Sequence, residues 1–371
     1  MAASRRTIVA GLCCVMSVGA SSGMRAARHF ATPEAKAQGL RWRARRRGMS
    51  FGSMMLATQT AGPLASVIQQ ECDIVVPGIE MKWGETEKRR GKPDYARADQ
   101  IVDFAHRSGI EVRGHAGFWY RNIPGWSRPL LQEPGADALI VARVGDIVRH
   151  FRGKVAEWDV VNEAVQPGDG LPWAMRRAPF GKAIDPGWIA DCFHAARDAD
   201  PKTLLAYNDY GLENAVPDDE SRRRATLGLL EELKRRNAPV QVMGLQTHIG
   251  VGQRFDADVY RRFLADVAAM GMKLRITEFD INDRRAPTDP AARDQAVADR
   301  ALQLLEVAFA EPAMLGMMTW GLSDADSQFQ GQPAMAREDG QPQRPLPFDS
   351  QLRRKPLWEA IARAYDGAPK R

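Results

Sequence analysis

The sequence predicts an α/β protein of a single domain, a (β/α)8 or TIM barrel, and three observations support this prediction. Short apolar or β-branched runs alternate with amphipathic runs of helical period, as expected of parallel strands that helices cover on both faces. With 371 residues, 44% of them apolar, the chain can bury one large core. No Gly/Ser-rich linker divides it. A doubly wound sheet is the competing fold, but residues 51–55 lack the Gly-rich phosphate turn that usually follows the first strand of such a sheet.

The first segment of the chain is expected to be separate from the barrel. Residues 1–30 place Arg5 and Arg6 before an apolar stretch, 8–20, which small residues follow. This pattern resembles a twin-arginine export signal, and the apolar stretch is too short to span a membrane comfortably. A disordered basic tail is the alternative. We therefore expect an exported protein, periplasmic or secreted, with no membrane attachment after the signal is removed.

A basic segment over residues 31–47 follows, in which 33–47 have a helix-forming composition. Residues 1–47 contain ten Lys/Arg and one acid, so they account for +9 against the formal +6 of the whole chain and leave −3 for residues 48–371. A nucleic-acid-binding protein needs a basic stripe in its folded body, and we find none. We expect a monomer that does not bind nucleic acid.

The barrel is expected over residues 48–366. Its strands are predicted at 50–55, 73–77, 110–116, 155–162, 203–208, 240–247, 273–280 and 315–320. Its helices are predicted at 62–70, 97–108, 136–151, 187–199, 218–237, 256–270, 289–310 and 356–366. Asp218 and Asp256 are expected N-caps, and Gly109 and Gly271 are expected C-terminal stops. Residues 331–349, rich in Pro, Gly and Gln, predict a loop.

Two cysteines lie in the predicted barrel, Cys72 and Cys192, each alone in its segment. Neither a CxxC motif nor a Cys/His spacing indicates a metal site. We expect two buried free thiols, and a disulfide is the alternative because export would permit one.

Polar and aromatic side chains stand where the predicted strands end. In this fold the loops at the carboxyl ends of the strands hold the catalytic groups. The residues concerned are His115, Trp119, Asn162, Glu163, Asn208, Tyr210, Gln246, His248, Glu278, Asp280 and Trp320. Acids and amides bond sugar hydroxyls, and indoles stack on the apolar faces of sugar rings. The set therefore indicates a carbohydrate site.

Glu163 and Glu278 each end a β-rich run, which suggests a pair of catalytic carboxyl groups. Glycoside hydrolysis needs one carboxyl group protonated and the other charged. Asp280 shares a strand face with Glu278, and a hydrogen bond from His248 would help to keep Glu278 ionised as the nucleophile. Glu163 follows an apolar strand, so exclusion of water by substrate would favour its protonated form as the acid/base. Taken singly, either glutamate could be a rim ion-pair partner.

Asn162 is expected to donate a hydrogen bond to the sugar 2-hydroxyl. Adjacent residues of an ideal strand face opposite ways, so an irregular backbone is needed for both Asn162 and Glu163 to reach one pocket.

These stretches resemble glycoside hydrolase family 10, the retaining β-1,4-xylanases, over nearly all of residues 48–365. The motifs are Met81-Lys82-Trp83, Arg113-Gly114-His115 with Trp119, Trp158-Asp159-Val160-Val161-Asn162-Glu163-Ala164, Tyr207-Asn208-Asp209-Tyr210, Gly244-Leu245-Gln246-Thr247-His248, Ile276-Thr277-Glu278-Phe279-Asp280 and Thr319-Trp320-Gly321-Leu322-Ser323-Asp324.

The resemblance implies Glu163 as acid/base and Glu278 as nucleophile, with His248 and Asp280 as the network around the nucleophile. Substrate would contact Lys82, His115, Trp119, Asn162, Asn208, Tyr210, Gln246 and Trp320. Lys82 would reach the attacked sugar and its neighbour toward the non-reducing end. The family needs no metal and no organic cofactor.

Five positions depart from the family pattern. Gly78 and Ile79 stand where a Glu-Asn pair usually contacts the second sugar toward the non-reducing end, Tyr120 replaces a His, Gln328 replaces a second Trp that roofs the pocket, and Gly211 replaces an Asn. Loss of polar contacts to sugar hydroxyls can shift specificity strongly.

The first hypothesis is therefore a retaining endo-1,4-β-xylanase that works by double displacement. The second keeps the mechanism and changes the substrate to another or a decorated β-glycan, or to a short oligosaccharide. The third is a carbohydrate-binding protein without catalysis.

Overall fold

The structure is a computed structural model that describes residues 39–179 and 185–371. The predicted export signal over residues 1–30 lies outside the described residues, and so does the part of the basic segment that precedes residue 39. No helix in the described part of the chain has both the length and the apolar character needed to cross a membrane.

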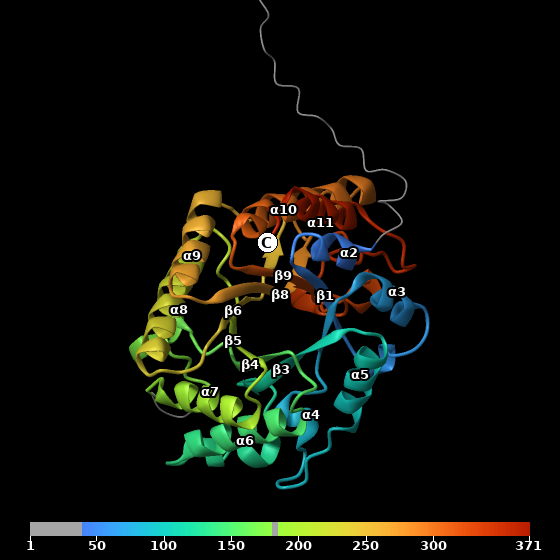
Figure 1. Cartoon of the computed structure of the whole chain (residues 1–371). Coiled ribbons are helices and arrows are strands. Elements are labelled where there is room, and N and C mark those ends of the chain that lie inside the picture. Colours follow the sequence, from blue (N-terminus) through green and yellow to red (C-terminus); the bar gives the residue numbers. More distant parts are fainter. Residues whose placement is uncertain (1–38, 180–184) are drawn as a thin grey trace, which may run out of the picture. The chain divides into compact units, whose positions relative to one another are not determined.

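Within these residues, eight parallel strands form a closed ring surrounded by helices (Figure 1). The strands of the ring are β1 (Ser50–Met55), β2 (Ile74–Pro77), β3 (Glu111–Trp119), β4 (Glu157–Asn162), β5 (Leu204–Asp209), β6 (Val242–Leu245), β8 (Lys273–Asn282) and β9 (Met314–Thr319). Two pairings close it, β6 with β8 and β9 with β1. The predicted (β/α)8 barrel is thus confirmed.

One predicted strand ends early. The run predicted over 240–247 stops at Leu245, and a separate strand, β7 (His248–Gly250), pairs with β8 alone. Thr247, between the two, has a φ of 59°, a left-handed backbone that breaks the ladder. The register of β7 places His248 opposite Asp280, so the break decides which side chains meet at this end of the barrel.

The main helices lie close to their predicted positions. They are α3 (Pro63–Glu71), α5 (Ala96–Arg107), α6 (Ala136–His150), α7 (Gly187–Ala199), α8 (Pro217–Arg235), α9 (Ala257–Ala269), α10 (Pro290–Ala310) and α11 (Pro356–Gly367). Two shorter helices are α2 (Leu40–Arg45), inside the segment predicted as helical, and α4 (Trp83–Thr86), which was not predicted. The apolar faces of the helices pack on the outside of the ring in one continuous core.

The predicted helix ends are right in three of four places. The Asp256 carboxylate accepts from the backbone amides of Asp258 and Val259, and Gly109 and Gly271 have φ angles of 65° and 84°. The prediction for Asp218 is wrong. Helix α8 begins with Pro217, whose fixed φ suits the first helical position, and Asp218 falls inside the first turn.

The loop over residues 331–349 holds no helix apart from a 3₁₀ turn at Pro333–Met335, as predicted. Cys72 and Cys192 are buried free thiols, also as predicted, and burial raises the pKa of both. Within the described residues, no three His, Cys, Asp or Glu side chains are grouped as a metal site requires.

Candidate active site

The predicted site residues come together at the carboxyl ends of the strands. Glu278 lies in β8 and Glu163 directly follows β4, and both side chains are almost fully buried, with 5% and 8% exposure. Three amide side chains connect the two glutamates, and two histidines flank Glu278.

The backbone at Glu163 is irregular, as the convergence of Asn162 and Glu163 requires. Glu163 has a φ of 58°, and the pairing of β4 with β5 shifts register between Asp159 and Val161. Both side chains therefore turn into the same pocket, where Asn162 Nδ2 donates to Glu163 Oε1 at 3.2 Å. This contact confirms the predicted irregularity.

Asn208 and Gln246 link the two carboxylates through Asn162. Asn208 Nδ2 donates to Glu278 Oε1 at 2.8 Å and to Asn162 Oδ1 at 2.9 Å. Gln246 Nε2 donates to Glu163 Oε1 at 3.0 Å and to Asn162 Oδ1 at 3.2 Å. Each glutamate is held by a different amide, so the pair is oriented before any ligand binds.

The position of Asn208 depends on a glycine of the neighbouring strand. Thr277 Oγ1 donates to Asn208 Oδ1 at 2.7 Å, and a β-carbon built on Gly244 would lie 2.3 Å from that same oxygen. No side chain at position 244 fits beside Asn208 in this place.

His248 connects Glu278 to Asp280. Its Nε2 lies 3.2 Å from Glu278 Oε2 and its Nδ1 lies 2.8 Å from Asp280 Oδ1. Burial disfavours the imidazolium, but the charges and hydrogen bonds of Asp280 and Glu278 outweigh it, and the pKa of His248 is raised well above its ordinary value. His248 is thus a cation that donates to both carboxylates.

Glu278 itself is held ionised. Burial opposes the charge, yet the hydrogen bond from His248 and the electrostatic effects of His115, His248 and Lys82 lower its pKa below the ordinary value. His115 Nδ1 is 4.0 Å from Glu278 Oε1, and Lys82 lies close enough for its charge to act on both glutamates.

Two indoles and Lys82 form one wall of the site. Lys82 Nζ is 4.4 Å from the ring centroid of Trp119 and 5.6 Å from that of Trp320. Burial lowers the pKa of Lys82, and Glu278 and Glu163 partly offset this effect. Among the described residues, the buried Trp119 Nε1 has no hydrogen-bond partner.

A buried cluster of ion pairs next to the site was not predicted from the sequence. Arg113, fully buried, pairs with Glu157 and Asp159, and Asp159 Oδ2 lies 2.9 Å from His115 Nδ1. Burial disfavours the Asp159 carboxylate, but Arg113 and His115 lower its pKa nevertheless. The one sign of this cluster in the sequence is that charged residues interrupt the apolar runs of β3 and β4.

Tyr210 lies apart from the amide cluster. Its hydroxyl accepts from Arg176 Nη2 at 3.2 Å and donates to Gln166 Oε1 at 3.3 Å, and Arg222 Cζ stands 4.1 Å from its ring centroid. Arg176 in turn donates to the backbone carbonyl of Glu163 at 2.7 Å. Tyr210 is therefore connected to the site by Arg176, a residue that the sequence did not single out.

Two departures lie on the Lys82 side. A β-carbon at Gly78 would lie 2.8 Å from Met54 Sδ, so a side chain there would require Met54 to move, and Ile79 is 38% exposed. Glu80 does not replace the missing carboxylate, because it is buried and accepts from the Ala57 amide at 2.7 Å.

The third departure, Gln328, joins the polar network around Glu278. Its Nε2 donates to Asp280 Oδ2 at 2.7 Å and lies 3.2 Å from His248 Nδ1. A polar amide thus takes the place of an indole above His248.

Comparison with known proteins assigns the chain to a family. The model of "Glycosyl hydrolase family 10" matches residues 39–364, which is most of the chain. The chain belongs to glycoside hydrolase family 10.

Relatives in this family are similar along most of the barrel. The chain is 30% identical over 312 residues to "Beta-1,4-xylanase" of Dictyoglomus thermophilum, covering 80% of this chain and 83% of that protein. It is 28% identical over 348 residues to "Endo-1,4-beta-xylanase C" of Paenibacillus barcinonensis, covering 86% of this chain but only 31% of that longer protein. Xylanase 10B of Thermotoga petrophila RKU-1, solved in complex with xylobiose, superposes with a TM-score of 0.78 at 26% identity, covering 88% of this chain and 97% of that one.

Proposed function

We infer that this family 10 glycoside hydrolase is a retaining endo-1,4-β-xylanase that cleaves internal bonds of xylan by double displacement. One observation carries the inference. Glu163 and Glu278 point into one pocket and are joined through Asn162, Asn208 and Gln246, but a histidine cation contacts only Glu278. Such asymmetry separates a charged carboxylate from one that can hold a proton, as glycoside hydrolysis requires, and membership of family 10 supports the retaining course.

In the first step, Glu278 attacks the anomeric carbon while Glu163 protonates the departing oxygen. The C–O bond to the leaving sugar breaks, a covalent glycosyl ester forms on Glu278, and the leaving group takes the proton of Glu163. In the second step, Glu163 removes a proton from water, and the water oxygen displaces Glu278 from the anomeric carbon. Both glutamates then return to their starting states.

The other residues bind or orient. Asn162 faces both glutamates and is placed to donate to the 2-hydroxyl of the attacked sugar, a bond that strengthens in the transition state. Lys82, Trp119 and Trp320 form the wall on which that sugar rests.

The same proposal includes the cellular context. Residues 1–30 act as an export signal, residues 31–47 connect it to a catalytic barrel over 48–366, and the mature enzyme works as a monomer in the periplasm or outside the cell. The twin arginines before an apolar stretch and the basic composition of the connecting segment support this arrangement.

A second candidate keeps the mechanism and changes the glycan. Gly78 offers no side chain to a second sugar, and the exposed Ile79 offers an apolar one, so the polar contacts on this side are few. Gln328 replaces a bulky indole above His248 and leaves more room there.

Initial rates on xylan, mixed-linkage glucan and the aryl β-glycosides of xylose and glucose decide between the two. If the protein is a xylanase, kcat/KM should be highest on xylan and on aryl xylosides, and short oligosaccharides should be the products. A higher kcat/KM on the glucan and aryl glucosides would select the second candidate. Binding of xylo-oligosaccharides by calorimetry with no cleavage would indicate a carbohydrate-binding protein and overturn both.

A further inference from the structure

An open cavity adjoins the active site on the side of Asp280. It has a volume of about 480 Å³, within the range of sites that hold small molecules. His248, which contacts Glu278, lines one end of it, and the turn after β8 lines the other. A ligand in this cavity would therefore lie beside His248, the residue that contacts Glu278.

The charged groups on the cavity wall are mainly cationic. Arg284 and Arg285, both exposed, come from the turn after β8, and Glu338 is the one acid among the described lining residues. Within the described residues, the side chain of Arg285 forms no ion pair or hydrogen bond, while Arg284 donates to the Ala334 carbonyl at 2.8 Å. A guanidinium without a protein partner presents its N–H groups as a fork that matches a carboxylate.

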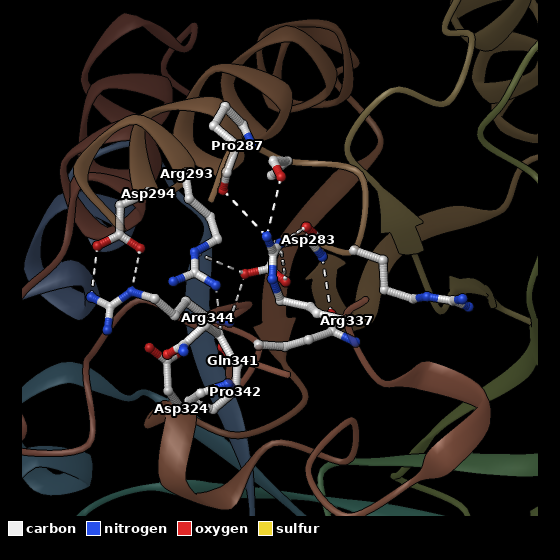
Figure 2. A network of polar contacts seen from close by, with 12 residues as sticks. Asp283, Pro287, Arg293, Asp294, Asp324, Arg337, Gln341, Pro342 and Arg344 are labelled. Carbon is white, nitrogen blue, oxygen red and sulfur yellow. Dashed lines mark hydrogen bonds and ion pairs between the residues drawn. The ribbon is translucent and has the colours of Figure 1, made fainter. Parts of the chain in front are cut away.

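The turn that carries the two arginines is held by a network of polar contacts around Asp283 (Figure 2). Asp283, fully buried, ion-pairs with Arg337 at 3.4 Å and with Arg293 at 3.8 Å, and it accepts from the backbone amide of Arg344 at 2.8 Å. The Asp283 backbone amide donates to Gln343 Oε1 at 3.0 Å. These contacts join the turn to helix α10 and to the loop over 331–349, so the arginines are held on a preorganised support.

The rest of the wall suits a sugar ring. Phe329 and Met335 supply apolar surface, and Gln253 and Asn282 supply amide groups. Asn282 Oδ1 accepts from the Arg284 backbone amide at 3.0 Å, and Gln253 Oε1 accepts from the Gly250 amide at 2.6 Å. Both amides are thereby oriented by the same turns that form the cavity.

We propose that this cavity binds the carboxylate of a uronic acid substituent on the glycan, with Arg285 as the principal ligand and Arg284 beside it. The inference rests on the proposed function, because it takes the backbone of the substrate to be a neutral β-glycan lying across Glu163 and Glu278. The enzyme would then prefer chains that carry an acidic sugar next to the cleaved bond. Arg285 determines specificity and takes no part in bond breaking.

The test compares three xylo-oligosaccharides of equal backbone length: unsubstituted, substituted with glucuronic acid, and substituted with its neutral methyl ester. The acid is expected to have a kcat/KM about two- to fivefold above that of the ester, as one solvent-exposed guanidinium–carboxylate pair supplies. Arg285→Ala should remove this advantage and Arg285→Glu should reverse it, with kcat/KM for the unsubstituted chain unchanged. Arg363→Ala, which removes one exposed charge from α11, is the matched control and should keep the advantage.

Equal rates on acid and ester with the wild-type enzyme, or an advantage that survives Arg285→Glu, would overturn the proposal. Failure to cleave even the unsubstituted chain would count against the proposed function and not against the cavity. In that case the difference between the calorimetric affinities of the acid and the ester decides, since the two ligands differ only at the carboxyl group that the cavity is proposed to bind.

Discussion

His248 Nε2 lies 3.2 Å from Glu278 Oε2, and the ring that makes this contact is held from its other nitrogen by Asp280 at 2.8 Å. The arrangement raises the pKa of His248 and, against the effect of burial, lowers that of Glu278. The ionisation of Glu278 thus depends on a residue that is not required to touch the substrate.

The first prediction concerns pH. The acid limb of kcat/KM should lie below the ordinary glutamate pKa of 4.5, and His248→Asn should move it upward by about one pH unit, because Glu278 loses a cationic donor. The pH profile of kcat/KM measures this shift. His150→Asn, at an exposed histidine paired with Asp99, is the control and should leave the limb in place.

The same histidine affects stability. Its folded pKa is raised above the unfolded value of 6.5, so its stabilising contribution is complete below pH 6.5 and is lost as the pH rises through the folded pKa. Melting temperatures from pH 6 upward should therefore fall less steeply for His248→Asn than for the wild type. Parallel curves would contradict the assignment of His248 as a cation in the folded protein.

A second prediction concerns Gln328, whose amide donates to the buried Asp280 at 2.7 Å. Gln328→Leu keeps much of the volume but removes the donor, and it should lower kcat/KM about tenfold or more, since a hydrogen bond to a charged group is lost. Gln328→Glu should be worse, because it places a second carboxylate against Asp280. Steady-state kinetics measure kcat/KM for the wild type and the two variants. If both variants have the wild-type kcat/KM, Gln328 does not position Asp280.

Much of the fold and of the candidate site could be predicted from short stretches of the sequence. The strand positions, both glutamates and the amides at strand ends could be predicted because short apolar runs, helical runs of period 3.6, and a polar residue at the end of an apolar run are visible within a few residues. The break at Thr247 could not, since a threonine gives no local sign of a left-handed backbone. The contacts of Arg113 with Asp159 and of Gln328 with Asp280 join segments 46 and 48 residues apart, so only the folded chain reveals them.

A third prediction compares the effects of an alanine substitution at two glycines. Gly244→Ala should cost about 1–3 kcal/mol of unfolding free energy and lower kcat, because the added β-carbon displaces Asn208 from Glu278. Gly228→Ala, in helix α8 with nothing within 4 Å of the added carbon, should be neutral or stabilise the fold by up to about 1 kcal/mol. Chemical denaturation and kcat are measured for both. Equal effects of the two substitutions would contradict the packing of Gly244 against Asn208.

A fourth prediction distinguishes the two glutamates by leaving group. Glu278→Ala should abolish turnover of all substrates. Glu163→Ala should lower kcat on xylan by about 10²–10⁴-fold but spare aryl glycosides whose leaving groups need no protonation. Equal residual activity of Glu163→Ala on activated and unactivated substrates would overturn the assignment of Glu163 as the acid.

The stereochemistry of hydrolysis tests the central claim most directly. Retention requires the carboxyl groups of Glu163 and Glu278 to lie about 5–5.5 Å apart, and inversion about 6.5–9.5 Å. Proton NMR during the first minutes of xylo-oligosaccharide hydrolysis reports which anomer forms before mutarotation. The account predicts that the β-anomer appears first. The α-anomer appearing first would contradict it.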